Sequence, residues 1–168
     1  MKRLLLITVV LMVFSTLTLA QSHRGRRVQS ARQQTDAKFF NAIEKGDLAT
    51  FYSLLKHGAN VNARGFAATT ALMNASLNNQ TEFLVALISK GARVNARNAF
   101  GNTALMDAAA SGQAEMVRWL LIAGANPNAK NESDWTALML ATKSAYAQQP
   151  NYQRVIELLK TAEAKKRL

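Results

Sequence analysis

The sequence has no cysteine, two histidines and two prolines, and it contains ten acidic residues against 21 lysines and arginines. The absence of cysteine excludes a disulfide framework, a cysteine nucleophile and a thiolate metal site. With two histidines, a histidine-rich metal site is excluded as well. The hydrophobic share of 49% is too high for a wholly disordered chain, and the length of 168 residues suggests one domain. The net charge of +11 indicates either an anionic partner or basic ends around a neutral domain.

The N-terminus has the three-part pattern of a secretory signal peptide. Two basic residues precede an apolar run over residues 4–19. Thr18-Leu19-Ala20 then places small residues at the positions that a signal peptidase recognises. The run is shorter than the roughly 20 apolar residues that span a bilayer, so we favour cleavage after Ala20 over a retained membrane anchor. We expect residues 1–20 to be a signal peptide and the mature protein to be periplasmic or secreted. The lack of cysteine favours a bacterial envelope.

The next segment, residues 21–34, is basic and almost without apolar side chains. It contains four arginines, no acid, and only valine and alanine as apolar residues. Such a segment buries too little surface to offset the entropy lost on ordering. We therefore expect residues 21–34 to form a disordered basic linker.

A period of 33 residues appears after this linker. The tetrapeptide Thr-Ala-Leu-Met begins at positions 70, 103 and 136, a Gly-Ala pair begins at 58, 91 and 124, and an Asn-Ala pair begins at 62, 95 and 128. Three markers that share one step indicate a stacked repeat array.

The local signals within one repeat predict a helix hairpin followed by an extended turn. Thr103 is a good N-cap for a short alanine-rich helix over residues 104–110, and Gly112 provides a left-handed stop. A second helix is predicted over residues 115–122, with an acidic first turn and Gly124 at its end. One such hairpin cannot bury its own apolar face, so neighbouring units must cover it.

These residues resemble the ankyrin repeat. The segment Gly58-Ala59-Asn60-Val61-Asn62-Ala63 matches the ending of that family's unit, and residues 101–105 match its start, with alanine in place of proline. Methionine stands at positions 73, 106 and 139, where the family has histidine, so a thioether replaces a buried hydrogen-bond network. The resemblance implies an all-α solenoid of about four helix hairpins with finger-like turns.

The repeat domain is predicted to cover residues 35–168. Its units lie near residues 36–66, 67–99, 100–132 and 133–168. The first unit lacks the Thr-Ala-Leu-Met start but keeps the apolar register at Phe39, Ala42, Leu54 and Leu55, so we interpret it as an N-terminal cap. The fourth unit has about five extra residues around 145–151, followed by a second helix from Tyr152 to about Lys165.

The sequence shows none of the patterns expected of an enzyme. It has no phosphate loop, no set of residues with metal-ligand spacing and no nucleophile motif. His57 stands at a predicted helix end, where a positive charge suits the helix dipole. Asp107 is the single acid on the predicted first helices of the middle units. We expect a protein that is not an enzyme and that uses no cofactor and no metal.

The family resemblance implies protein binding through a concave groove formed by the turn tips and the first helices. Each predicted tip carries one aromatic residue, Phe66, Phe100 or Trp135, and large rigid rings are typical of binding hot spots. For Trp135, local packing on the adjacent tip is an equally good interpretation. Trp119 on a second helix is expected to be a half-exposed residue of the opposite face. The candidate partner-binding residues are Phe66, Thr69, Asn74, Phe100, Asn102, Asp107, Glu132 and Trp135.

The positive charge lies mostly at the ends of the chain. Residues 21–34 carry +4 and residues 165–167 carry +3, whereas residues 35–164 carry only +2. A nearly neutral array favours a protein partner over specific nucleic-acid binding, and we expect the protein to be a monomer. The family resemblance leaves an inhibitor, immunity, protective or effector role open. The alternative hypothesis is electrostatic adhesion of the basic ends to an anionic surface or polymer, which salt would weaken.

Overall fold

The computed structural model describes residue 29 and residues 31–165, so the predicted signal peptide lies outside the described residues. Residues 31–34 of the predicted linker are helical, which differs from the disorder expected there. Their sequence, Ala-Arg-Gln-Gln, consists of good helix formers, and the Thr35 hydroxyl donates a hydrogen bond to the Ala31 carbonyl at 3.0 Å. Within the described part of the chain, no helix is long and apolar enough to cross a membrane.

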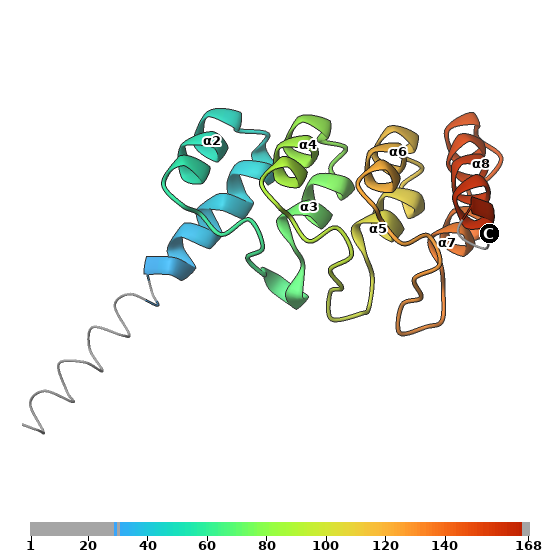
Figure 1. The fold of residues 1–168 in the computed structure, drawn as a ribbon, viewed down its shortest axis with the longest axis horizontal. Helices are drawn as coiled ribbons and strands as arrows, with labels where there is room; N and C mark the ends of the chain where they lie inside the picture. The colour runs from blue at the N-terminus through green and yellow to red at the C-terminus, as the bar shows by residue number, and fades with distance from the viewer. Residues whose placement is uncertain (1–28, 30, 166–168) are drawn as a thin grey trace, which may run out of the picture. The chain divides into compact units, whose positions relative to one another are not determined.

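From Asp36 onward, helix hairpins follow one another along the chain (Figure 1). A helix that reaches residue 45 pairs with the next helix to form the first hairpin, and three further hairpins follow. The named helices are α2 (Leu48–Lys56), α3 (Ala71–Leu77), α4 (Thr81–Ser89), α5 (Ala104–Ala110), α6 (Ala114–Ile122), α7 (Ala137–Lys143) and α8 (Pro150–Lys165). The structure thus confirms the all-α architecture of stacked hairpins that the repeat predicts.

The hairpins stack so that equivalent helices lie side by side. The first helices α3, α5 and α7 contact one another in order, and α6 contacts both α4 and α8 in a second row. Figure 1 shows long loops, which we call the fingers, extending from the first-helix row on the side away from the second helices. The fingers and the second helices therefore form two separate surfaces of the array.

A threonine begins each first helix of units two to four. The hydroxyls of Thr70, Thr103 and Thr136 each accept a hydrogen bond from the backbone amide three residues ahead, at 3.3 to 3.4 Å. These bonds satisfy amides that have no partner within the helix. The predicted cap of α5 and its bounds, residues 104–110, are confirmed.

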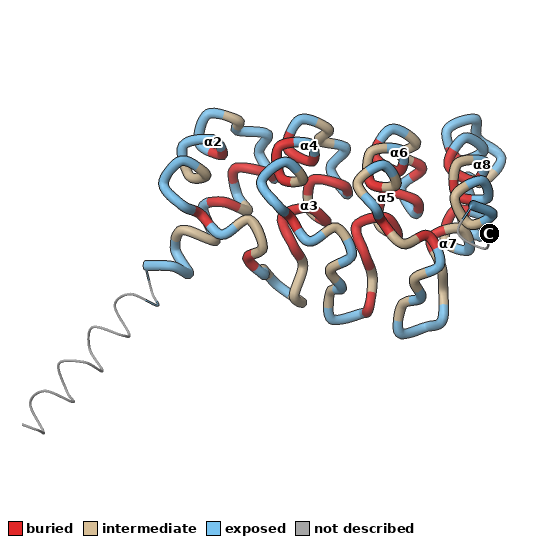
Figure 2. The backbone as a smooth tube through the Cα atoms, in the orientation of Figure 1, coloured by how far each residue is buried: buried red, intermediate tan, exposed pale blue. Residues whose placement is uncertain are grey.

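Both rows of helices contribute buried residues to the core (Figure 2), and the first helices combine alanines with leucine and methionine. Buried alanines such as Ala75 and Ala108 allow the hairpins to approach closely, and leucines such as Leu87 and Leu120 fill the space behind them. Met73 and Met106 are also fully buried, as the thioether substitution predicts, whereas Met139 in the last unit is 46% exposed. The difference arises because no further hairpin covers the last unit.

The first unit has a largely aromatic core. The ring of Phe51 stacks on Phe39 at 5.1 Å between centroids and meets the edge of Phe83 at 4.8 Å. Phe39 and Ala42 are buried, as the apolar register predicts. Phe51 and Ile43 are equally buried but were not part of the predicted core.

The last unit is held to its neighbour by the start of α8. This helix begins at Pro150, two residues before the predicted start, because proline suits the first helical position. The Tyr152 hydroxyl donates a hydrogen bond to the Ala110 carbonyl at 2.9 Å, and its ring lies over Gly112. Gly112 has φ +67° as predicted, and a Cβ atom there would lie 2.5 Å from the Tyr152 ring. The glycine therefore serves both the turn and the packing of α8.

We expect Gly112→Ala to destabilise the protein more than Gly124→Ala does. Both glycines have positive φ, but a Cβ at Gly124 would meet nothing within 4 Å. The control should therefore lose only the cost of left-handed backbone, about 1 to 2 kcal/mol, and the Gly112 variant should lose more because Tyr152 must move. Urea unfolding of both variants measures the difference, and equal losses would contradict the packing role of Gly112.

Candidate functional site

Two of the three fingers turn around an asparagine side chain. The Asn98 carboxamide oxygen accepts hydrogen bonds from the amides of Phe100 and Asn102 at 2.9 and 3.0 Å. One repeat later, the Asn131 oxygen accepts from the amides of Ser133 and Trp135 at 3.0 Å each. Asparagine suits such turns because its short side chain can replace a backbone acceptor. Both tips are thus fixed by their own sequence.

The first finger reaches a similar turn with a strained backbone. Gly65 stands where the later fingers have asparagine, and a 3₁₀ turn follows over Phe66–Ala68. Ala67 and Ala68 have φ of +49° and +58°, a left-handed region that side chains with a Cβ avoid. Such strain persists only where surrounding contacts hold it, and it is frequent at binding sites. In this conformation the Phe66 side chain is 95% exposed.

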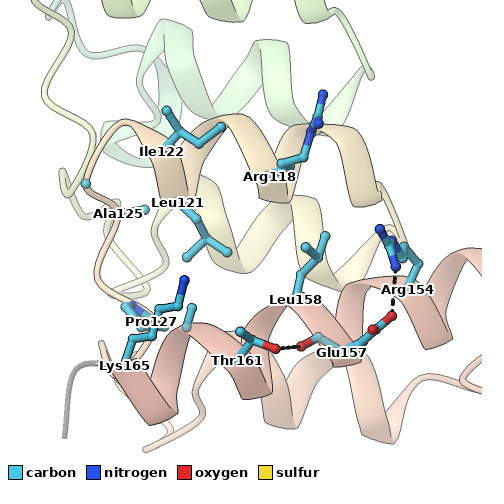
Figure 3. A pocket seen from close by; sticks show the side chains of 12 residues that line it. Arg118, Leu121, Ile122, Ala125, Pro127, Arg154, Glu157, Leu158, Thr161 and Lys165 are labelled. Carbon is cyan, nitrogen blue, oxygen red and sulfur yellow. Dashed lines mark hydrogen bonds and ion pairs between the residues drawn. The ribbon is translucent and has the colours of Figure 1, made fainter. Parts of the chain in front are cut away.

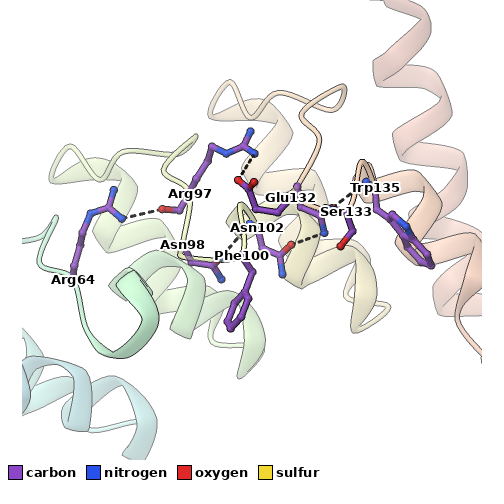
Figure 4. A network of polar contacts seen from close by, with 9 residues as sticks. Arg64, Arg97, Asn98, Phe100, Asn102, Glu132, Ser133 and Trp135 are labelled. Carbon is purple, nitrogen blue, oxygen red and sulfur yellow. Dashed lines mark hydrogen bonds and ion pairs between the residues drawn. The ribbon is translucent and has the colours of Figure 1, made fainter.

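The fingers are bonded to one another in a row (Figure 4). The Arg64 guanidinium donates to the Ala68 carbonyl of its own finger at 3.3 Å and to the Arg97 carbonyl of the next finger at 2.9 Å. The Arg97 side chain in turn lies 3.7 Å from the Glu132 carboxylate of the third finger. The Asn131 side-chain amide donates to the Asn102 side-chain oxygen at 2.8 Å. Each tip is therefore linked to the next by polar contacts.

The backbone adds two further links between the fingers. The Ala99 amide donates to the Ala67 carbonyl at 2.8 Å, and the Glu132 amide donates to the Phe100 carbonyl at 3.1 Å. The first of these bonds engages one of the left-handed alanines, so the neighbouring finger helps to hold the strained turn. Asn102 and Glu132, both predicted to bind a partner, take part in these links between fingers.

The three aromatic residues of the tips differ in exposure. Phe66 and Phe100 are 95% and 64% exposed, as a binding surface requires. Trp135 is only partly exposed, and the Lys143 ammonium lies 4.9 Å from the centroid of its ring. Lys143 is the last residue of α7, so the ring of Trp135 has a cation–π contact within its own unit, which differs from both interpretations given above. Thr69 is partly buried beside the first tip.

The first helices carry a polar row behind the fingers. Asn74 on α3 and Asp107 on α5 stand one repeat apart and are both partly exposed. The Asn74 side chain donates to the Glu44 carboxylate at 3.3 Å and accepts from the Asn78 side-chain amide at 2.6 Å. Asn74 is thus already satisfied, and Glu44 enters this row without having been predicted.

Asp107 is the unsatisfied member of the row. Its carboxylate has neither a hydrogen bond nor an ion pair with any residue that the structure describes. Burial among the helices raises the pKa of Asp107 from 3.8 to about 7, because the charged form loses solvation without gaining a partner. A carboxyl group that ionises near neutral pH on a binding surface is a candidate contact for a cationic group.

Several residues of this surface were missed from the sequence, among them Glu44, Arg64 and Arg97. Asn98 and Asn131 shape the tips, and their spacing of one repeat was the signal that could have revealed them. Lys143, the last residue of α7, lies over the ring of Trp135, which precedes that helix, and no sequence pattern indicates this contact. Among the described residues, no three His, Asp or Glu side chains lie together in a way that could hold a metal ion.

We expect Asp107→Asn to stabilise the protein above pH 7 by roughly 2 to 4 kcal/mol. Between pH 4 and 7 the unfolded chain has lost the Asp107 proton while the folded chain keeps it, so the contribution of Asp107 to the stability of the wild type falls as pH rises. Asparagine is compatible with this position, since Asn74 occupies it one repeat earlier. Urea unfolding at pH 4 and pH 8 measures the effect, with exposed Glu82→Gln as the control. A variant advantage that does not grow with pH would contradict the burial of this carboxyl.

Comparison with known families agrees with this architecture. The family model described as ankyrin repeats in three copies matches residues 39–131, which is more than half of the chain. The match begins within the first helix of the first hairpin and covers the next two hairpins and the first two fingers. The comparison with curated proteins gives no match.

Proposed function

Because the chain belongs to the ankyrin repeat family, we propose that it binds another protein through its fingers and first helices and catalyses no reaction. Ankyrin repeats are protein-protein interaction modules and are typically non-catalytic. We call the proposed surface the finger face; it consists of the tips at residues 65–69, 98–102 and 131–135 together with the exposed side chains of α3 and α5.

The observation that carries this proposal is the exposure of Phe66 and Phe100 on tips that are bonded in place. Large rings in water are costly unless another surface covers them, and rigid aromatic side chains lose little entropy on binding. The links from Arg64 and Arg97 hold the tips before any partner arrives. Such preorganisation lowers the entropic cost of association.

Asp107 adds a chemical preference to the finger face. A partly buried carboxylate without a counterion is stabilised by a partner that brings a lysine or arginine to it. Such a contact would be strongest above pH 7, where the carboxyl group is ionised. The partner that fits is therefore a protein with an apolar patch for the two phenylalanines and a cationic side chain nearby.

The proposal includes export of the protein. The signal-peptide pattern of residues 1–20 and the absence of cysteine support a periplasmic or secreted protein of a bacterial envelope. The near-neutral charge of residues 35–164 supports a protein partner over a nucleic acid, and we propose that the array acts as a monomer.

We expect the double variant Phe66→Ala, Phe100→Ala to lose partner binding while keeping its stability within about 0.5 kcal/mol, since neither ring is buried. The mature chain is immobilised, partners are recovered from the native envelope, and each recovered protein is quantified against the double variant. A true partner should fall at least tenfold. The matched control is Tyr146→Ala, which removes an aromatic side chain that is 60% exposed but lies outside the fingers.

Two outcomes would contradict the proposal. Unfolding of the double variant would place the rings in the core. Partners that still bind the double variant but are lost in high salt, or after deletion of residues 21–34, would instead support electrostatic adhesion by the basic ends.

Adding Trp135→Ala to the double variant tests the covered ring, and we expect little further loss of binding because Lys143 already occupies its face.

A further inference from the structure

A groove lies away from the fingers, between α6 and α8 of the second-helix row (Figure 3). It is a groove of about 500 Å³, a size typical of pockets that hold small molecules. Its walls are largely apolar, with Leu121 and Ile122 from α6, Leu158 from α8 and Pro127 from the following loop. Ile122 is 70% exposed, which is unusual for a large aliphatic side chain.

The groove runs along α8. Its α8 wall consists of positions spaced three or four residues apart, which form one stripe along the helix from Arg154 to Lys165. At a rise of about 1.5 Å per residue, this stripe is about 16 Å long. A stripe of this length is comparable to an extended alkyl chain of about twelve carbons, and the leucine, isoleucine and proline side chains of the groove offer it an apolar surface. A peptide helix would need axes about 8 to 10 Å from both walls.

Two differences between the units account for the apolar opening. Ile122 stands one repeat after Ser89, so an apolar side chain replaces a polar one at this position. On α8, Leu158 comes two residues after the buried Ile156. On α6, Trp119 comes two residues after the buried Val117, so Leu158 and Trp119 occupy equivalent positions. A smaller side chain therefore stands where the previous unit has an indole. The last pair of units therefore differs from the pair before it at two positions that line this groove.

The charges around the groove are unequal. Arg118 pairs with Glu115 and Arg154 pairs with Glu157, each at 2.9 Å, so both arginines are neutralised by acids of their own helices. Lys165, at the opposite end of α8, has no acidic partner among the described residues. One end of an apolar groove thus carries an uncompensated positive charge (Figure 3).

We propose that this groove binds a fatty acid, with the alkyl chain between α6 and α8 and the carboxylate at Lys165. The apolar walls would cover the chain and remove Ile122 from water, which is favourable by the hydrophobic effect. The lysine ammonium supplies the counterion and hydrogen-bond donors that a carboxylate needs. The site uses none of the residues of the finger face.

The test uses the full mature chain and the fluorescent fatty acid 11-(dansylamino)undecanoate. We expect saturable binding with increased dansyl emission and displacement by dodecanoate. Dodecanol and dodecyltrimethylammonium, which have the same chain without the negative charge, should displace the probe at least tenfold less well. Equal displacement by all three would overturn the role of Lys165, and the absence of saturable binding would overturn the proposal.

Two variants and their matched controls locate the site. Lys165→Glu should weaken binding at least tenfold, whereas Lys160→Glu, on the same helix but outside the groove, should not change it. Ile122→Asp should also weaken binding at least tenfold, whereas Ser89→Asp at the equivalent position of α4 should not. Both Ile122 and Lys165 are exposed, so the variants should fold, and circular dichroism melting checks this. Unchanged affinity in a folded Lys165 or Ile122 variant, or displacement by an acidic amphipathic peptide in preference to dodecanoate, would reject the fatty-acid site.

Discussion

The structure depends on the burial of each hairpin's apolar face by the neighbouring hairpin. A first helix of seven residues is too short to be stable alone, and its alanines bury little surface until another first helix lies against them. The stack makes this possible because units two to four present the same small residues at the same positions. Nearest-neighbour packing of this kind, with a threonine cap in each of these three units, is what the period of 33 residues encodes.

The two ends of the array cannot follow this rule, and each has its own solution. The first unit has an aromatic core in which Phe51 contacts rings on both sides. The last unit uses a longer second helix, tied to its neighbour by Tyr152. That helix covers the core but leaves Met139 and Ile122 in contact with water. The fatty-acid groove is thus a consequence of ending a repeat array with a helix that departs from the repeat.

The finger face contains several features that lower stability. Two left-handed alanines, two exposed phenylalanines and a desolvated carboxyl group each raise the free energy of the folded chain. They lie together on the finger face, whereas the second-helix row has other costs, the exposed Ile122 and the buried side-chain oxygens of Gln80 and Gln113 that have no hydrogen-bond partner in the described part of the chain. Features that lower stability and gather on one surface are better explained by binding than by folding, because a partner can satisfy all three.

The sequence by itself determined the repeat, its period, the bounds of α5, the threonine caps and the exposure of Phe66 and Phe100, because all of these depend on local propensity or on a pattern that repeats. It also indicated the aromatic tips, but it could not separate Trp135 from the other two rings. Only the tertiary structure decided that Lys143 covers Trp135, that Asp107 lacks a counterion and that Asn102 and Glu132 bond one finger to the next. Each of these properties depends on which side chains come close together when the elements pack, and a sequence pattern does not specify that.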